Sequence, residues 1–278
     1  MARRVHLQEL LVGVEGLALL RHLYDGTDAD AERRLAEVSE IMGDKSLTAA
    51  EAIEEADARS GYAAWSESYD QPGNPIVAIE EPAVWTILDR ISPRRALDAA
   101  CGTGRHGRHL AEAGHRVVGV DLSPEMLTRA RENVPALAEA DLAALPLPDA
   151  AFDVAVCGLA LAHVVDLDCA VAELARVLVP GGRLVISVLH PFQAYLGWHA
   201  PFEDRAGRRG FVREHAHRHS GYLAAFHRAG LTVRGCVEPQ LGAAEGKAKR
   251  RAFRHIPEAV LAAYEGLLGV LVWDVEKT

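Results

Sequence analysis

Residues 96–104 read Ala-Leu-Asp-Ala-Ala-Cys-Gly-Thr-Gly, and the architecture of the chain can be worked out from this stretch. An apolar run ends at Asp98, small residues follow, and residues 105–113 have the pattern of an amphipathic helix. Small residues at such a turn let a ligand lie against bare backbone. The first N–H groups of the next helix have no partners within it and carry partial positive charge. The stretch therefore predicts a strand, a turn and a helix that bind a nucleotide.

Two kinds of nucleotide fit this turn. Residues 102–107, Gly-Thr-Gly-Arg-His-Gly, match the G-x-G-x-x-G pattern of dinucleotide-binding folds, which favours an NAD(P) oxidoreductase. Asp98 favours the other reading, because a carboxylate before the turn repels a pyrophosphate and attracts an ammonium group. S-adenosylmethionine (SAM) has a sulfonium, an ammonium group and no phosphate. Asp121, after the next apolar run, can hold a ribose in either case.

The turn resembles the D-x-x-x-G-x-G motif of class I, seven-strand SAM-dependent methyltransferases, with Asp98, Gly102 and Gly104 at the motif positions. Ala100 stands where that family often has glycine. The resemblance covers roughly residues 60–190 and rests on several ordered motifs.

Two later motifs also resemble this family. Asp141 and Leu142 resemble its acidic loop, which implies that Asp141 meets the adenine amino group and that Leu142 lies beside the ring. Residues 176–182, Arg-Val-Leu-Val-Pro-Gly-Gly, resemble its helix and turn before the fifth strand.

The resemblance implies an α/β fold: a doubly wound, mostly parallel seven-strand sheet with a C-terminal antiparallel hairpin, preceded by an N-terminal helical extension. The alternation of strand and helix patterns over residues 96–188 supports a parallel sheet independently. The implied cofactor is SAM. The residues expected to bind it are Tyr62, Tyr69, Asp98, Ala100, Cys101, Gly102, Thr103, Gly104, Asp121, Leu122, Met126, Asp141, Leu142, Gly158 and Leu159.

The chain divides into three parts. Residues 1–58 are expected to form a helical extension for dimerisation or for covering the substrate, with helices at 7–24, 28–42 and 48–58. Residues 59–90 hold an aromatic lid helix and a helix that precedes the core. Residues 91–278 are the SAM-binding core, with a helical insertion at about 239–268.

Three aromatic residues precede the core. Tyr62, Trp65 and Tyr69 are spaced three and four apart, so they share a face if the segment is helical. The segment resembles a helix that covers the cofactor and one acceptor wall in small-molecule methyltransferases, and aromatic rings attract cations. Simple core packing is the alternative. Trp65 is a candidate for contact with the acceptor.

Methyl transfer requires alignment of a lone pair with the methyl–sulfur bond and, for an O–H or N–H nucleophile, removal of a proton. His163 follows the fourth strand of the core and His190 follows the fifth. Histidine titrates near neutral pH, so both are candidate bases. Each is equally well explained as a structural histidine that holds a loop.

A basic, histidine-rich region follows the core. His215, His217 and Arg254 are candidates for binding an anionic acceptor, with a solvated surface as the alternative. His215, His217 and His219 alternate, but no carboxylate or thiolate stands at convincing ligand spacing, so no metal site is predicted.

Composition narrows the function classes. The four cysteines form no C-x-x-C pair, which argues against a zinc ribbon or disulfide framework and suits the cytoplasm. No uncharged apolar stretch reaches ~18 residues, and polar residues come too early for a secretory signal. The net charge of −9 argues against a general nucleic-acid binder.

The sequence therefore predicts a cytoplasmic SAM-dependent methyltransferase that methylates an O, N or C atom of a small molecule, with an anionic compound or a secondary metabolite as candidates. A homodimer is a further expectation. The alternatives are a tRNA or RNA methyltransferase and a non-catalytic SAM-binding protein.

Overall fold

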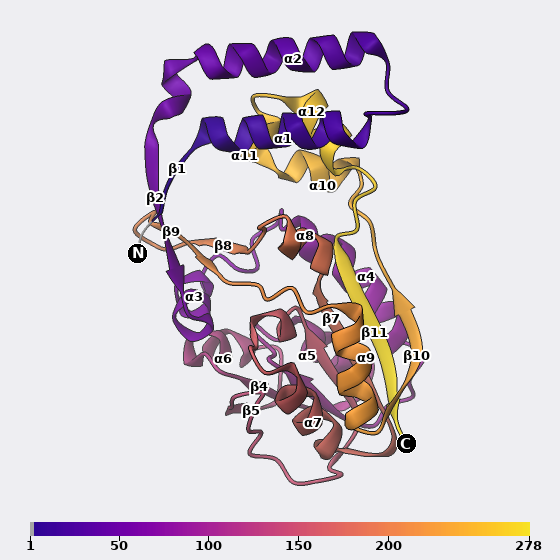
Figure 1. Ribbon diagram of the computed structural model, residues 1–278. Helices are drawn as coiled ribbons and strands as arrows, with labels where there is room; N and C mark the ends of the chain where they lie inside the picture. The colour runs from indigo at the N-terminus through magenta and orange to yellow at the C-terminus, as the bar shows by residue number, and fades with distance from the viewer. Residues whose placement is uncertain (1–2) are drawn as a thin grey trace. The chain divides into compact units, whose positions relative to one another are not determined.

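The computed structural model describes residues 3–278. The chain forms two compact units. One holds residues 3–54, 72–78 and 240–267, and the larger one holds residues 55–71, 79–239 and 268–278. Figure 1 labels the helices and strands of both.

The larger unit is built on a seven-stranded sheet with the strand order β10-β11-β7-β6-β3-β4-β5. Strands β5, β4, β3, β6 and β7 are parallel to their neighbours, whereas β11 is antiparallel to β7 and to β10. The bounds are β3 (Arg95–Ala99), β4 (Arg116–Asp121), β5 (Ala136–Glu139), β6 (Phe152–Gly158), β7 (Leu178–Leu189), β10 (Leu231–Val237) and β11 (Val270–Lys277). This confirms the predicted α/β sheet with its C-terminal antiparallel hairpin.

The strand order fixes where a ligand can bind. From β3 the chain adds β4 and β5 on one side of the sheet and then crosses to β6 and β7 on the other. Ligands of such sheets bind outside the carboxyl ends of the strands, at the point where the order reverses. The turn after β3 lies at this point.

The helices of this unit begin where the sequence supplies caps. Ser123 Oγ accepts the N–H of Met126, with Pro124 at the first helical position, and Asp166 Oδ1 accepts the N–H of Cys169. The helices are α3 (Ala58–Trp65), α4 (Pro75–Leu88, in this unit from Ile79), α5 (Arg105–Glu112), α6 (Pro124–Ala130), α7 (Leu167–Val177), α8 (Pro191–Tyr195) and α9 (His219–Arg228).

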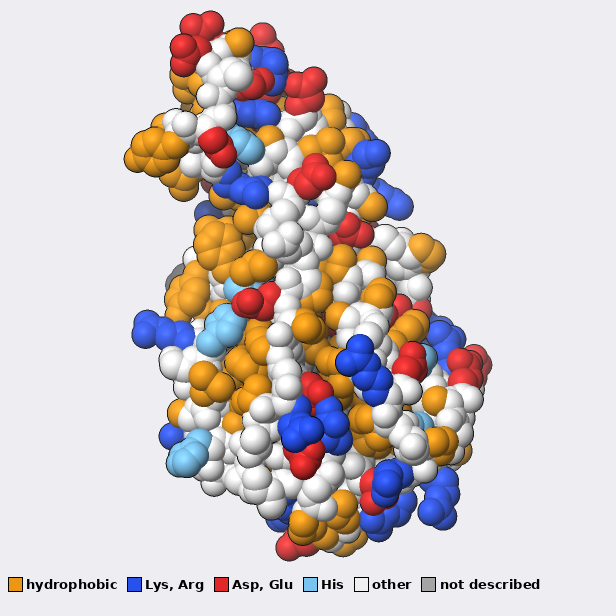
Figure 2. Space-filling view, turned by 90° about the vertical axis from the view of Figure 1, so that its right-hand side faces the viewer, with side chains coloured by type: hydrophobic (Ala, Val, Ile, Leu, Met, Phe, Trp, Pro, Cys, Tyr) orange, Lys and Arg blue, Asp and Glu red, His pale blue; other side chains and the backbone are white. Residues whose placement is uncertain are grey.

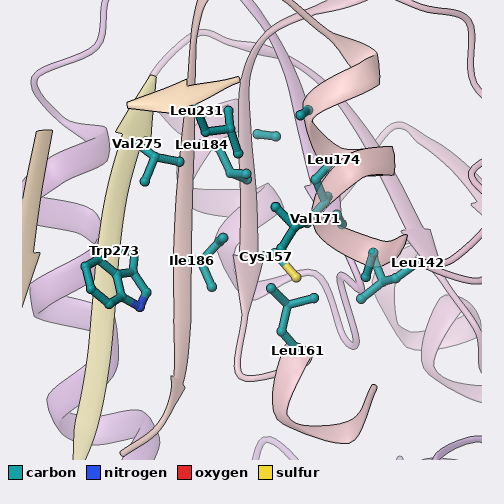
Figure 3. Close-up of a cluster of buried hydrophobic side chains, with 14 of the residues drawn as sticks. Leu142, Cys157, Leu161, Val171, Leu174, Leu184, Ile186, Leu231, Trp273 and Val275 are labelled. Carbon is teal, nitrogen blue, oxygen red and sulfur yellow. The ribbon is translucent and has the colours of Figure 1, made fainter. Parts of the chain in front are cut away.

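The main core lies between one face of the sheet and the helices α7 and α9. Figure 3 shows Cys157 and Ile186 of β6 and β7 together with Val171 and Leu174 of α7. All four side chains are fully buried. This layer holds the carboxyl ends of β6 and β7 in place.

A short hairpin also belongs to the larger unit. Strands β8 (Ala200–Glu203) and β9 (Arg209–Val212) pair in antiparallel fashion. Neither strand was predicted. The chain after β9 leads through residues 213–218 to α9.

The smaller unit combines both ends of its sequence ranges. Its elements are β1 (Arg3–His6), α1 (Leu7–Arg21), α2 (Asp28–Gly43), most of β2 (Ala50–Ala56), α10 (Ala243–Ala248), α11 (Arg250–Phe253) and α12 (Pro257–Tyr264). The guanidinium of Arg21 donates to the carbonyls of Ala262, Ala263 and Glu265, at the end of α12. The insertion that the sequence assigned to the core therefore packs with the N-terminal helices.

One predicted helix is wrong. Residues 48–58 were expected to be helical, but a 3-10 turn covers Lys45–Thr48 and β2 follows it. Strand β2 pairs with β1 from Arg3↔Ile53 to His6↔Ala50. This long-range pairing outweighs the helical preference of its alanine and glutamate residues.

No helix among residues 3–278 is long and apolar enough to cross a bilayer.

We expect Gly107→Ala to destabilise the larger unit. A Cβ at Gly107 would lie 2.4 Å from Val134 Cγ2 and 3.0 Å from Asp98 Oδ2. The midpoint of thermal unfolding should fall, by the equivalent of about 1–3 kcal/mol. Gly221→Ala is the matched control, because the nearest atom to its Cβ is Leu167 Cδ2 at 4.0 Å. It should leave stability unchanged or raise it. Equal midpoints for the two variants would contradict the packing argument.

Candidate functional site

A cavity of about 370 Å³ lies in the larger unit, at the carboxyl edge of its sheet. Its walls come from α3, from the turn after β3 and from the loops after β4, β5 and β6. They consist of Ala58, Arg59, Tyr62, Tyr69, Ala100, Gly102, Asp121, Leu122, Ser123, Ala140, Asp141, Leu142, Ala143, Gly158, Leu159, Ala160, His163, Val164, Val165 and Asp166.

Eleven of the residues proposed from the sequence line this cavity. They are Tyr62, Tyr69, Ala100, Gly102, Asp121, Leu122, Asp141, Leu142, Gly158, Leu159 and His163. Asp98, Cys101, Thr103, Gly104, Met126, Trp65, His190, His215, His217 and Arg254 are not among the lining residues.

The turn after β3 is tied to the end of β4. Asp121 accepts the N–H of Gly102 on one carboxylate oxygen and the N–H of Ser123 on the other, both at 2.8 Å. A Cβ at Gly102, where φ is +54°, would meet nothing within 4 Å, so glycine leaves open space there. The carboxylate and the bare backbone form one wall.

Two non-glycine residues of the cavity wall have left-handed backbones. Ala100 has φ +56° and Leu159 has φ +54°. Such conformations cost energy for residues with a Cβ and concentrate at functional sites. The conformation of Ala100 also explains why glycine is common at this motif position.

Asp98 lies beside the turn, not in the cavity wall. Its side chain is buried, and Oδ2 accepts the N–H of Gly107 at 2.7 Å. Oδ1 is buried without a hydrogen-bond partner among the described residues. Burial raises the pKa of Asp98 to about 7. Direct contact between Asp98 and a ligand therefore stays a prediction.

The other predicted residues outside the wall support it. Thr103 Oγ1 donates to Asp70 at 2.7 Å, and Met126 is buried under α6. Trp65 stacks on Tyr62, with the ring centroids 5.8 Å apart. Helix α3 ends at Trp65, so Tyr69 lies beyond it, yet its ring centroid is 6.1 Å from that of Tyr62. The expected aromatic group forms, but not on one continuous helix, because the chain turns at residues 66–70.

A buried ionic network, which the sequence reading missed, stands behind the turn. Glu80 of α4 has no solvent exposure and contacts Arg105 at 2.5 Å and His106 at 3.0 Å. Ser187 Oγ of β7 donates to the same carboxylate. Burial alone would raise the pKa of Glu80, but His106 and Arg105 hold it well below its usual range. A glutamate within the apolar run Ile76–Leu88 was the available signal.

His163 is held by two hydrogen bonds at the cavity wall. Its Nδ1 lies 2.8 Å from the carbonyl oxygen of Arg213, and its Nε2 lies 2.7 Å from Tyr62 Oη. A carbonyl only accepts, so the proton of the neutral ring is on Nδ1 and Nε2 accepts the Tyr62 hydroxyl. Burial lowers the pKa of His163, which favours this neutral form.

Glu214 lies next to this pair and was also missed. Its Oε1 is 3.8 Å from His163 Nε2, and its Oε2 is buried without a partner. Burial raises the pKa of Glu214 to about 8.

His190 contacts a different group. Its Nδ1 accepts the N–H of Phe192, so Nε2 carries the proton and donates to Glu238 at 3.0 Å. His219 donates to the same carboxylate oxygen at 3.0 Å. These three residues could hold a metal by distance, but both Nε2 atoms present hydrogens to Glu238. They satisfy one another as they stand.

The remaining candidates lie elsewhere. The N–H of His215 donates to the carbonyl of Ala162, and the His217 ring contacts the carbonyl of Val164 at 2.7 Å. Both therefore hold the loop that follows β6. Arg254 is exposed and belongs to the smaller unit.

Replacement of Glu80 by Gln should destabilise the protein by about 3–5 kcal/mol, because it leaves the buried Arg105 without its counter-charge. The pKa of Glu80 is lower in the folded than in the unfolded chain. The difference from wild type should therefore be complete above the usual glutamate pKa and shrink as the pH falls below it. Unfolding in urea at several pH values measures this.

Glu81→Gln is the control for this variant. Glu81 is 27% exposed and lies 3.6 Å from Arg105, so its loss should cost less than about 1 kcal/mol. Equal losses for the two variants would show that burial of Glu80 does not matter.

Comparisons with known proteins agree with this architecture. Residues 97–186 match a family model described as "Methyltransferase domain". The chain is 43% identical over 108 residues to demethylmenaquinone methyltransferase of Thermus thermophilus, which covers 36% of this chain and 49% of that protein. It is 32% identical over 180 residues to malonyl-[acyl-carrier protein] O-methyltransferase of Halorhodospira halophila, which covers 60% of each. The chain thus spans about half the length of the curated relatives it matches first.

A solved structure is similar over most of the chain. It is an S-adenosylmethionine dependent methyltransferase from Mesorhizobium loti, with 26% identity and a TM-score of 0.54, covering 72% of this chain and 98% of that one. The match supports both the fold and the cofactor that the sequence predicted.

Proposed function

We propose that this chain, which carries a class I SAM-dependent methyltransferase domain, transfers a methyl group from SAM to an O, N or C atom of a small-molecule acceptor. The observation that carries the proposal is the cavity at the carboxyl edge of the sheet. The bare backbone of Gly102, the carboxylate of Asp121 and the Asp141–Leu142 loop all face it.

The residues present fit SAM. Gly102 leaves open space for a ligand against the backbone, and Asp121 is held where a ribose can bind. Asp141 is exposed in the loop after β5, and Leu142 beside it is buried, which suits an adenine edge and face. The unpartnered Oδ1 of Asp98 is a buried acceptor that an ammonium group would satisfy.

When bound, SAM supplies a methyl group on positively charged sulfur. The chain aligns the acceptor and, for an O–H or N–H nucleophile, takes up its proton. Tyr62 Oη faces the cavity and donates to His163 Nε2. A proton from the acceptor can pass to the Tyr62 oxygen as the Tyr62 proton passes to His163. His190 lies outside the cavity wall, so we assign the role of base to His163.

The acceptor class is open among the relatives, whose names specify demethylmenaquinone and the malonyl-acyl carrier protein. An RNA acceptor has less support, because on the face drawn in Figure 2 most Lys and Arg side chains lie beside Asp and Glu and form no continuous basic surface. A homodimer formed by the N-terminal helices stays a prediction.

Calorimetry should detect SAM binding and no comparable NADH binding. Asp141→Ala should weaken SAM binding about tenfold, because one hydrogen bond to the adenine is lost. Asp149→Ala is the control: its side chain is 78% exposed, pairs with Arg176 and does not line the cavity. Tight NADH binding without SAM binding would overturn the assignment in favour of an oxidoreductase.

A His163→Gln variant should bind SAM normally and form S-adenosylhomocysteine (SAH) from O–H or N–H acceptors ~10²–10⁴-fold more slowly. The measurement is SAH release with a panel of candidate acceptors. His227→Gln, an exposed change near the end of α9, should keep the wild-type rate. SAM binding without SAH formation from any acceptor would instead indicate a non-catalytic SAM-binding protein.

A further inference from the structure

Glu214 is a buried carboxyl group without a partner. It follows β9 in the segment that leads to α9. Its side chain is 8% exposed, and Oε2 makes no hydrogen bond to any residue that the structure describes. Buried carboxylates are normally paired or hydrogen-bonded. A missing partner at this place therefore needs an explanation.

The neighbouring cations do not supply that partner. Arg213 pairs with Glu55 through two contacts of 2.6 and 2.5 Å. His199 Nδ1 accepts the backbone N–H of Glu214 and contributes no donor there. His163 Nε2, at 3.8 Å, is beyond hydrogen-bond range and is already occupied by Tyr62.

Glu214 lies at the acceptor end of the proposed site. Oε1 is directed at the Tyr62–His163 pair, and both members of that pair line the cavity. The missing hydrogen-bond donor can therefore come from a molecule in the cavity. Because Tyr62 and His163 are the proposed route for the proton of the acceptor, that molecule is the acceptor itself.

The charges and rings around the cavity favour a cation. Asp121, Asp141 and Asp166 line it, whereas Arg59 in the same wall pairs with Glu139 at 2.6 Å. An anionic acceptor would meet carboxylates here, and a neutral one would leave Glu214 without a counter-charge. The aromatic rings of Tyr62, Trp65 and Tyr69, whose centroids lie 5.0–6.1 Å apart, also attract cations.

We propose that Glu214 binds the protonated amino group of the methyl acceptor, and that the chain is an N-methyltransferase of a small amine. This inference rests on the proposed function and specifies its acceptor. It assigns a cationic acceptor in place of the anionic one that the basic residues near the C-terminus suggested.

The proton balance follows from the same residues. The ammonium group donates one N–H to the Glu214 carboxylate. A second N–H proton passes to Tyr62 Oη as the Tyr62 proton passes to His163 Nε2, which leaves a lone pair on the nitrogen. The N–C bond then forms as the methyl–sulfur bond breaks, and that electron pair stays on sulfur. The imidazolium of His163 and the carboxylate of Glu214 face each other with opposite charges.

The test uses the full chain saturated with SAH and three small probes of similar size: butylamine, butanol and butyrate. NMR titration at pH 8 should give at least tenfold tighter binding of butylammonium than of the other two. Glu214→Gln should abolish that preference and leave the affinity for SAH unchanged. Glu55→Gln, an exposed carboxylate already paired with Arg213, is the matched control and should keep the preference.

The outcomes separate the two proposals. Failure of the wild-type chain to bind SAH would overturn the proposed function. Normal SAH binding without a preference for butylammonium, or with a preference that survives in Glu214→Gln, would overturn the inference alone.

A second measurement needs no probe. Without ligand, Glu214→Gln should unfold at the same or a higher temperature than wild type, since an amide replaces a carboxyl that has no partner. A clearly lower unfolding temperature would mean that contacts within the protein hold Glu214, and would overturn the inference.

Discussion

The carboxylate of Glu80 is the constraint on which the geometry of the cofactor side depends. An ionised carboxylate without solvent exposure is stable only when donors surround it. Arg105 and His106 stand at the start of α5, and Ser187 stands in β7, so all three donors come from elements that border the turn after β3. The network therefore fixes α4, the start of α5 and the end of β7 with respect to one another.

Two other buried carboxyls follow the opposite pattern. Asp98 and Glu214 each keep one oxygen without a partner, where Glu80 has contacts on both. The first lies beside the turn at the cofactor end of the site, and the second lies beside His163 at the acceptor end. Unsatisfied buried oxygens are costly in a folded protein, so their presence at both ends of one site is consistent with ligand groups that complete them.

Much of the sheet could be predicted, because alternating apolar runs and small-residue turns are local signals; β10, for example, spans the predicted residues 231–237. The same is true of Asp121 and Asp141, which follow apolar runs. The strand at 50–56 was missed because its partner is distant in sequence. Glu214 was missed because it stands in a charged, histidine-rich segment that reads as exposed, and only tertiary packing buries it.

The two ends of the site come from different sources. The cofactor side is made by strand ends and their turns, which cannot change without disturbing the sheet. Tyr62 belongs to a helix that precedes the sheet, and Glu214 belongs to a connection that follows β9. In evolutionary terms, the selectivity of such a protein can diverge through these peripheral segments while the nucleotide pocket is inherited intact.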